Sequence, residues 1–310
     1  MKISRHKEHN YSLDLLRILG AFGIVWFHAP GGVPGKNIGY SGLVIFIVVS
    51  IALMIPRIPS PGFVAKRAKR LLVPWLFWYF VYGTLNVITG NSFLPAGISP
   101  IDAILSGPKF HLWYLPFLFF TSISIYYLIR LLKELEGLKA VILYASLTLF
   151  LLFTTGLWRS WSMGLGPPWS QWTHALPAVF IGASIGYISG TNSGKKSAIF
   201  LLLFSFIVSC VSLLIIHIGY KGVGVPYLIG TALTGIAFIY NLPRSDILAD
   251  ISGLSFGIYL THPLIYLLVI KFMKIQLPPT GYIITLVFIL SGLLTMCIKK
   301  TPLRLTKWIV

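Results

Sequence analysis

The first apolar stretch of the sequence, Ser12 to Pro30, contains three ionisable side chains: Asp14, Arg17 and His28. Ionisable groups are costly in lipid unless they face protein or water, so each is a functional candidate. Asp14 and Arg17 are three residues apart and can meet on one face of a helix. His28 lies roughly 16 Å further along that helix than Arg17. Its neutral imidazole can accept a proton from a hydroxyl group. The competing interpretations are an interfacial anchor for the ionic pair and a structural hydrogen bond for His28.

A second group of candidates lies in the connection Pro56 to Arg70. This connection places Lys66, Arg67, Lys69 and Arg70 within five positions. Arg67 and Arg70 share a helix face if the following helix starts early. Guanidinium groups match phosphate geometry, so the cluster predicts an anion site. Topogenic charge with affinity for anionic lipid is the alternative.

The third group is the sequence FHLWYLPF at residues 110–117, which opens a later apolar segment. If the amino terminus is cytoplasmic, this segment enters the membrane from outside. His111, Trp113 and Tyr114 should therefore lie at a depth comparable with His28. An ordinary interfacial aromatic cluster is the alternative. Taken together, the three groups suit a donor molecule with a phosphorylated handle and a long arm.

Composition indicates which elements position these residues. The sequence is 56% hydrophobic and 10% charged, whereas an ordinary soluble domain has about 25% charged residues. We therefore expect an integral membrane protein whose first span is retained rather than cleaved. Ten apolar segments are long enough to cross a bilayer as helices. They lie near residues 12–30, 38–56, 71–89, 111–130, 138–157, 173–190, 197–217, 223–241, 253–272 and 280–298. The segments at 173–190 and 223–241 contain Pro or several Gly and are the candidates for a broken or tilted helix.

The net charge of +18 comes from 25 Lys and Arg against 7 acids. In a soluble protein this balance would suggest nucleic acid, but most basic residues here cluster at the ends of apolar segments, so no nucleic-acid partner is expected. With a cytoplasmic amino terminus, 18 of the 25 fall on inner segments and 6 on outer ones. This bias predicts that both termini are cytoplasmic. The fold class is thus an all-α polytopic membrane protein, a bundle of about ten transmembrane helices forming one domain over residues 1–310.

Two features leave the function open. Cys210 and Cys297 lie in apolar runs without CxxC spacing, so they indicate no disulfide framework and no metal site. The long outer connection 158–172 contains four Trp, at positions 158, 161, 169 and 172. These residues suit either an aromatic belt at the lipid headgroups or a sugar-stacking surface.

The sequence resembles the acyltransferase-3 family of bacterial membrane proteins, which transfer acyl groups, often acetyl, to cell-surface carbohydrates. Four stretches carry the resemblance: LDLLRILGAFGIVWFH at 13–28, GFVAKRAKRLLVPW at 62–75, HLWYL at 111–115 and SFGIYLTHPL at 255–264. Their order and their placement on a ten-helix plan make the combination specific. The resemblance implies a stand-alone membrane domain in the bacterial inner membrane.

The family's functional positions transfer to individual residues. They fall on Arg17, His28, Arg67, Arg70 and the segment Trp113 to Leu115. His262 matches the closing Tyr-Leu-x-His-Pro element, and we assign it no catalytic role. Ile51 stands where such proteins usually have Gly after Ser, which argues against a close backbone approach at Ser50.

The resemblance implies O-acylation, most simply O-acetylation, of a cell-surface or lipid-linked carbohydrate with acetyl-CoA as donor and without a metal. The expected donor-binding residues are Arg17, Arg67 and Arg70. The expected catalytic residues are His28, as general base, and Asp14, as the group that orients an arginine. The expected acceptor-binding residues are His111, Trp113 and Tyr114, of which His111 and Trp113 are alternatively placed to stabilise the oxyanion. Membrane lipids and polysaccharide-assembly proteins are the expected partners.

Two other classes of function remain. A glycan or organic-anion transporter or flippase would use the same charges as a permeation path, but no internal repeat of the kind many transporters show is visible. A non-catalytic membrane partner in a polysaccharide-assembly complex would tolerate the loss of His28.

Overall fold

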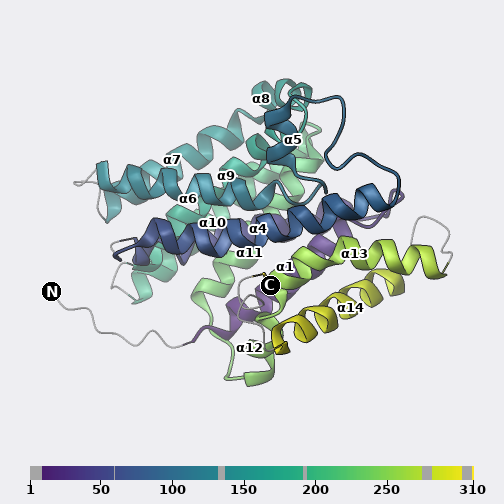
Figure 1. The fold of residues 1–310 in the computed structure, drawn as a ribbon. Helices are drawn as coiled ribbons and strands as arrows, with labels where there is room; N and C mark the ends of the chain where they lie inside the picture. The colour runs from purple at the N-terminus through teal and green to yellow at the C-terminus, as the bar shows by residue number, and fades with distance from the viewer. Residues whose placement is uncertain (1–8, 59, 132–136, 191–193, 274–280, 302–308) are drawn as a thin grey trace.

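The computed structural model describes residues 9–58, 60–131, 137–190, 194–273, 281–301 and 309–310 (Figure 1). Every regular element in these ranges is a helix, which confirms the all-α prediction. The elements are α1 (Tyr11–Phe27), α2 (Lys36–Gly39), α3 (Ser41–Ala52), the 3-10 helix η1 (Ile55–Arg57), α4 (Phe63–Ile88), α5 (Pro100–Ser106), α6 (Tyr114–Leu131), α7 (Leu138–Phe153), α8 (Thr155–Gly164), α9 (Trp169–Gly190), α10 (Gly194–His217), α11 (Lys221–Ile239), α12 (Asp246–Ser252), α13 (Ser255–Met273) and α14 (Gly281–Lys300).

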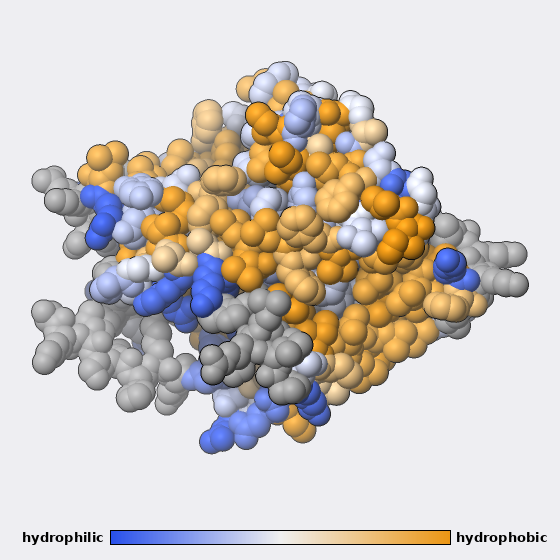
Figure 2. Space-filling model, viewed as in Figure 1, coloured by the Kyte–Doolittle hydropathy of each residue, from blue (hydrophilic) through white to orange (hydrophobic). Residues whose placement is uncertain are grey.

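Each of the ten predicted membrane segments is occupied by a helix. Seven helical segments of the described chain are long and apolar enough to cross a membrane, or up to eight if α7 and α8, bent by 70°, form one span. The seven are Lys36–Arg57, α4, α6, α10, α11, Ser255–Phe272 and α14. Figure 2 shows an apolar surface over the long helices, with hydrophilic residues gathered at the left end of the view and around α12. The protein is therefore a multi-pass membrane protein, while the number of ten spans and the cytoplasmic side of the termini stay predictions.

The two segments expected to be broken or tilted are continuous helices. α9 contains Pro177 and α11 contains Pro226, and neither helix is interrupted.

Other boundaries differ from the predicted ones. α4 begins at Phe63 rather than near residue 71, because its first two turns are basic and hydropathy marks only the apolar remainder. The two long outer connections contain the short helices α5 and α8.

The central helix is α3, in which ten of twelve residues are buried. It packs against α1, α9 and α11. Glycines allow the backbones of α1 and α3 to meet, since a Cβ on Gly42 would lie 2.2 Å from the carbonyl oxygen of Gly20. Small residues serve this purpose widely in membrane helices. This crossing fixes α1, which carries Asp14 and Arg17 and is followed directly by His28, against the middle of the bundle.

Position 51 carries Ile where related proteins usually have Gly, and a glycine of another helix makes room for this larger side chain. Ile51 is fully buried and packs against Gly182 of α9, where an added Cβ would lie 2.8 Å from the Cβ of Ile51. Ser50 still reaches its neighbour, since its hydroxyl accepts a hydrogen bond from Arg67 at 2.9 Å. The small residue that allows the two helices to approach closely is thus Gly182 of α9, and not a glycine at position 51 of α3.

Candidate active site

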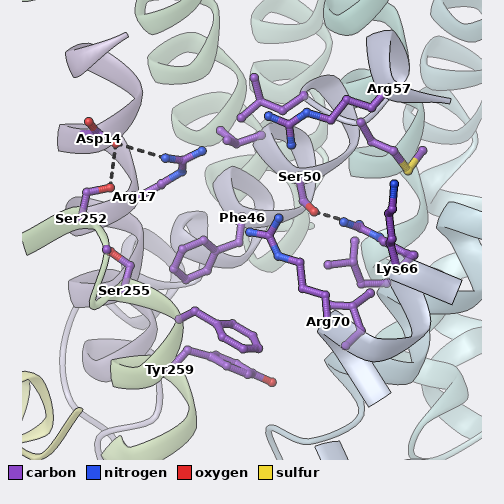
Figure 3. A pocket seen from close by; sticks show the side chains of 18 of the residues that line it. Asp14, Arg17, Phe46, Ser50, Arg57, Lys66, Arg70, Ser252, Ser255 and Tyr259 are labelled. Carbon is purple, nitrogen blue, oxygen red and sulfur yellow. Dashed lines mark hydrogen bonds and ion pairs between the residues drawn. The ribbon is translucent and has the colours of Figure 1, made fainter. Parts of the chain in front are cut away.

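A cavity of about 580 Å³ opens among the first turns of α1, α4 and α13 and the end of α3. We call it the basic cavity, defined by Arg17, Arg57, Lys66, Arg67, Arg70 and Asp14. Figure 3 shows the guanidinium groups of Arg17, Arg57 and Arg70 extending from three different elements into the same space. Five cations and one carboxylate line it, so its charge favours a polyanionic ligand.

Arg67 is held rigidly at one side of the basic cavity. Its Nε donates to Ser122 Oγ at 3.0 Å, and one of its terminal nitrogens donates to Ser50 Oγ at 2.9 Å. The serines lie on α6 and α3, so three helices fix one guanidinium. Because both partners are neutral, the positive charge remains available to a ligand.

Asp14 and Arg17 form the predicted ionic pair, with Arg17 Nη1 3.1 Å from Asp14 Oδ1. The Asp14 carboxylate is almost completely buried and also accepts hydrogen bonds from Ser252 Oγ, at 2.8 Å, and from His9. The buried Asp14 carboxylate therefore joins α1 to the region of α12, and it orients the partly exposed Arg17 towards the basic cavity. Asp14 is fourteen positions from His28 on the same helix, about 20 Å at the usual rise, so it does not share a proton with it.

A second cavity, of about 640 Å³, lies at the other end of α1. We call it the histidine cavity, defined by His28, His111, His174, Trp113, Lys36 and Arg159. The expectation that the FHLWYLPF segment reaches the depth of His28 is confirmed. The ring centroids of His28 and Phe110 are 4.7 Å apart, and those of His28 and His111 are 6.5 Å apart.

His28 is hydrogen-bonded to His262, with 3.0 Å between His28 Nδ1 and His262 Nε2. The other nitrogen of His262, Nδ1, lies 2.8 Å from the carbonyl oxygen of Tyr259. A carbonyl oxygen only accepts, so His262 carries its proton on Nδ1, and its Nε2 accepts from His28 Nδ1. His28 Nε2 is left with a lone pair. The network therefore presents His28 as a base through Nε2.

His111 is almost completely buried, with 1% of its surface exposed. Neither of its ring nitrogens makes a hydrogen bond of normal geometry in the described part of the protein, and the backbone of Leu260 interacts with the ring without meeting that geometry. Its ring centroid lies 5.3 to 5.4 Å from those of Tyr82, Tyr259 and His262. Buried polar groups are normally paired, and an orphaned one needs an explanation. A ligand entering the histidine cavity would supply the missing partner.

Two side chains, Tyr114 and Tyr259, line both cavities. Both are buried, their ring centroids are 5.2 Å apart, and the hydroxyl of Tyr259 donates to the carbonyl oxygen of His111. We call this pair the tyrosine wall. It lies between the basic cavity and the histidine cavity.

Sequence reasoning missed several residues of this site. His262 was assigned no catalytic role, and Tyr259, Arg57 and Arg159 were not singled out. His262 lies 234 positions from its partner His28, and no local spacing links the two. The Tyr and His of SFGIYLTHPL, three positions apart on one helix face, were the signal available.

The four Trp of the outer connection do not line the histidine cavity. Trp158 Nε1 donates to the carbonyl oxygen of Leu151 at 2.8 Å, and Trp169 Nε1 donates to Asp102 Oδ1 at 2.7 Å. This connection instead contributes Arg159 to the cavity. An acceptor stacked in the cavity would meet Trp113 of the HLWYL stretch, not these four residues.

Comparison with known proteins identifies the family. The acyltransferase-3 family model, described as an acyltransferase domain, matches residues 10–298 and so covers nearly the whole chain. No significant match was found among curated proteins or among solved structures. The matched region contains the residues that define both cavities and the tyrosine wall. The chain therefore belongs to the acyltransferase-3 family and is a membrane acyltransferase.

Proposed function

We propose that the protein is an O-acyltransferase of the bacterial inner membrane that transfers the acyl group of acyl-CoA, most simply acetyl-CoA, to a hydroxyl of a cell-surface or lipid-linked carbohydrate. The observation that carries the proposal is the meeting of the basic and histidine cavities at Tyr114 and Tyr259. A donor held by its phosphates in one cavity would present its far end at the base in the other.

Coenzyme A carries its charge on phosphate groups at one end and its thioester at the end of a flexible arm. The basic cavity suits the charged end, with Arg17, Arg67 and Arg70 as the principal phosphate ligands. Among the described residues, Arg70 makes no hydrogen bond or ion pair, so its guanidinium is free to bind a ligand. The separation of roughly 16 Å between Arg17 and His28 along α1 is the span that the arm would cover.

His28 is the proposed general base. Its Nε2 takes the proton of the acceptor hydroxyl while the hydroxyl oxygen attacks the thioester carbonyl carbon. A carbon–oxygen bond forms, and the carbon–sulfur bond then breaks. His28 returns the proton to the departing thiolate, which leaves as coenzyme A. While His28 is protonated, His262 Nε2 still accepts its Nδ1 proton, so His262 is a positioning residue that stabilises the charged form.

The remaining residues bind or orient the reactants. His111 carries a proton on one unpaired ring nitrogen and would donate it to the thioester oxygen as negative charge develops there. Trp113 and Tyr114 provide apolar faces for the acceptor and the acyl group, respectively. Asp14 acts at a distance from the reaction by orienting Arg17.

The proposal is tested with purified protein in lipid vesicles and radiolabelled acetyl-CoA. The substitution His28→Ala should abolish transfer to the carbohydrate while binding of coenzyme A is retained. The substitution Arg70→Ala should weaken donor binding. Unchanged glycan acylation in the His28 variant would remove His28 from the catalytic role.

Matched controls exist for both variants. His217, at the end of α10, is an exposed histidine that lines neither cavity, and Arg130, at the end of α6, is an exposed arginine that lines neither. Their Ala variants should transfer and bind as the wild type does. The rival transporter function predicts solute movement without release of coenzyme A, so thiol release measured beside solute uptake separates the two.

A further inference from the structure

The charged lining of the histidine cavity is entirely cationic. Lys36 and Arg159 line it, and no Asp or Glu of the described chain does. Asp102, the acid that the sequence places in the predicted outer connections, already accepts a hydrogen bond from Trp169 Nε1 at 2.7 Å. A cavity lined by two cations and, within the described chain, by no carboxylate attracts anions.

Arg159 is fixed in place without being neutralised. Its Nη1 donates to the carbonyl oxygen of Ser170 at 3.0 Å, and it lies 3.4 Å from the hydroxyls of Ser162 and Ser170. All three partners are uncharged. The other guanidinium nitrogens make no hydrogen bond within the described residues. A guanidinium that keeps its remaining donors free is suited to a carboxylate or a phosphate.

A neighbouring side chain is incompletely paired. Gln171 lines the same cavity, and its Oε1 is buried without a hydrogen-bond donor in the described part of the chain. An amide oxygen in this position accepts from a hydroxyl group. The cavity thus offers cations and a hydroxyl acceptor, which complement the anion and the hydroxyl donors of an acidic sugar.

Topogenic charge does not account for these cations. They lie at the predicted outer end of the bundle, where 6 of the 25 basic residues occur and where the positive-inside bias disfavours them. Ligand binding therefore explains Arg159 and Lys36 better than a role in setting the membrane topology does.

We infer that the carbohydrate acceptor carries an anionic group, a carboxylate or a phosphate, which Arg159 and Lys36 bind while Gln171 accepts a hydrogen bond from a sugar hydroxyl. This inference rests on the proposed function and specifies its acceptor.

The test uses vesicle-reconstituted protein, acetyl-CoA and a panel of short glycosides, each sugar supplied as a neutral form, a uronic acid and a sugar phosphate. The wild type should show a higher kcat/KM for the charged forms, and the preferred one identifies the anion. The substitution Arg159→Gln should raise the KM for charged acceptors about tenfold, as expected for loss of a charge-assisted hydrogen bond, and leave the KM for neutral ones unchanged. Lys36→Gln should act in the same direction, and Arg130→Gln should have no effect.

Two results would overturn the inference and are distinguishable. Equal kcat/KM for neutral and charged acceptors, or an equal loss for both in the Arg159 and Lys36 variants, would refute anion recognition and leave the acyltransferase proposal intact. Absence of coenzyme A release with every member of the panel would refute the proposed function itself. Thermal unfolding of each variant shows whether a lost activity reflects a lost fold.

Discussion

The hydrogen bond between His28 and His262 makes a quantitative prediction. In His262→Leu the acceptor for His28 Nδ1, now 3.0 Å away, is removed while an apolar side chain fills the space. His28 is then free to place its proton on Nε2, the nitrogen needed as the base, and its protonated form loses a partner. A hydrogen bond to a charged group contributes about 1.5–3 kcal/mol. At about 1.4 kcal/mol per tenfold, kcat should fall about 10- to 100-fold.

The assay is the initial rate of acyl transfer at varied acetyl-CoA, which separates kcat from KM. The donor KM should be unchanged because His262 does not line the basic cavity. His262→Gln is the matched variant, since its Oε1 stands in for Nε2 as acceptor and its amide group can still donate to the Tyr259 carbonyl. It should retain activity within a few-fold of the wild type.

The reasoning is refuted if His262→Leu retains full kcat. It is also refuted if the Leu and Gln variants are equally inactive while both unfold at the wild-type temperature. In that case His262 would have a role other than holding the tautomer of His28.

Three further predictions concern the basic cavity and the packing of the bundle. Ser50→Ala removes one of two hydrogen bonds to Arg67 and should raise the donor KM about fivefold, and an unchanged donor KM would show that the remaining hydrogen bond suffices. Asp14→Asn weakens the orientation of its arginine partner and should raise the donor KM several-fold while leaving kcat unaltered; a fall in kcat alone would instead favour direct catalysis. Gly42→Ala forces a Cβ to within 2.2 Å of a carbonyl oxygen and should destabilise the protein by about 1–3 kcal/mol, measured as thermal unfolding in detergent. Gly190→Ala, where an added Cβ meets nothing within 4 Å, is its control, and equal unfolding temperatures would contradict the packing argument.

Much of the fold could be predicted because its signals are local. Hydropathy located all ten helical segments, since each apolar run satisfies its backbone hydrogen bonds within itself. Reliance on apolar runs also placed the start of α4 too late in the sequence. Its first turns carry Lys66 and Arg70, and hydropathy alone does not distinguish a basic helical turn from a loop.

The site was predictable only where functional residues are close in sequence. Asp14 and Arg17 are three positions apart, and their contact was expected and found. The pairing of His28 with His262 and the joining of two cavities by Tyr259 depend on how distant helices pack. Arg159 was counted only as a minority charge on the predicted outer face. Its cavity-facing position follows from the bend between α7 and α8, for which hydropathy has no signal.

The tyrosine wall has an electrical consequence for the proposed transfer. The acyl group, formally an acyl cation, passes the wall in one direction on the donor thiol, and the hydroxyl proton passes in the other direction on the thiol of the coenzyme A that leaves. The acyl group and the proton each count formally as one positive charge and move in opposite directions, so a complete turnover carries no net charge across the membrane. The phosphates of the donor remain on their own side throughout. Tyr114 and Tyr259 are buried neutral side chains, so the wall itself adds no charge to the path of the exchange. The reaction would then run at the same rate in an energised and a de-energised membrane.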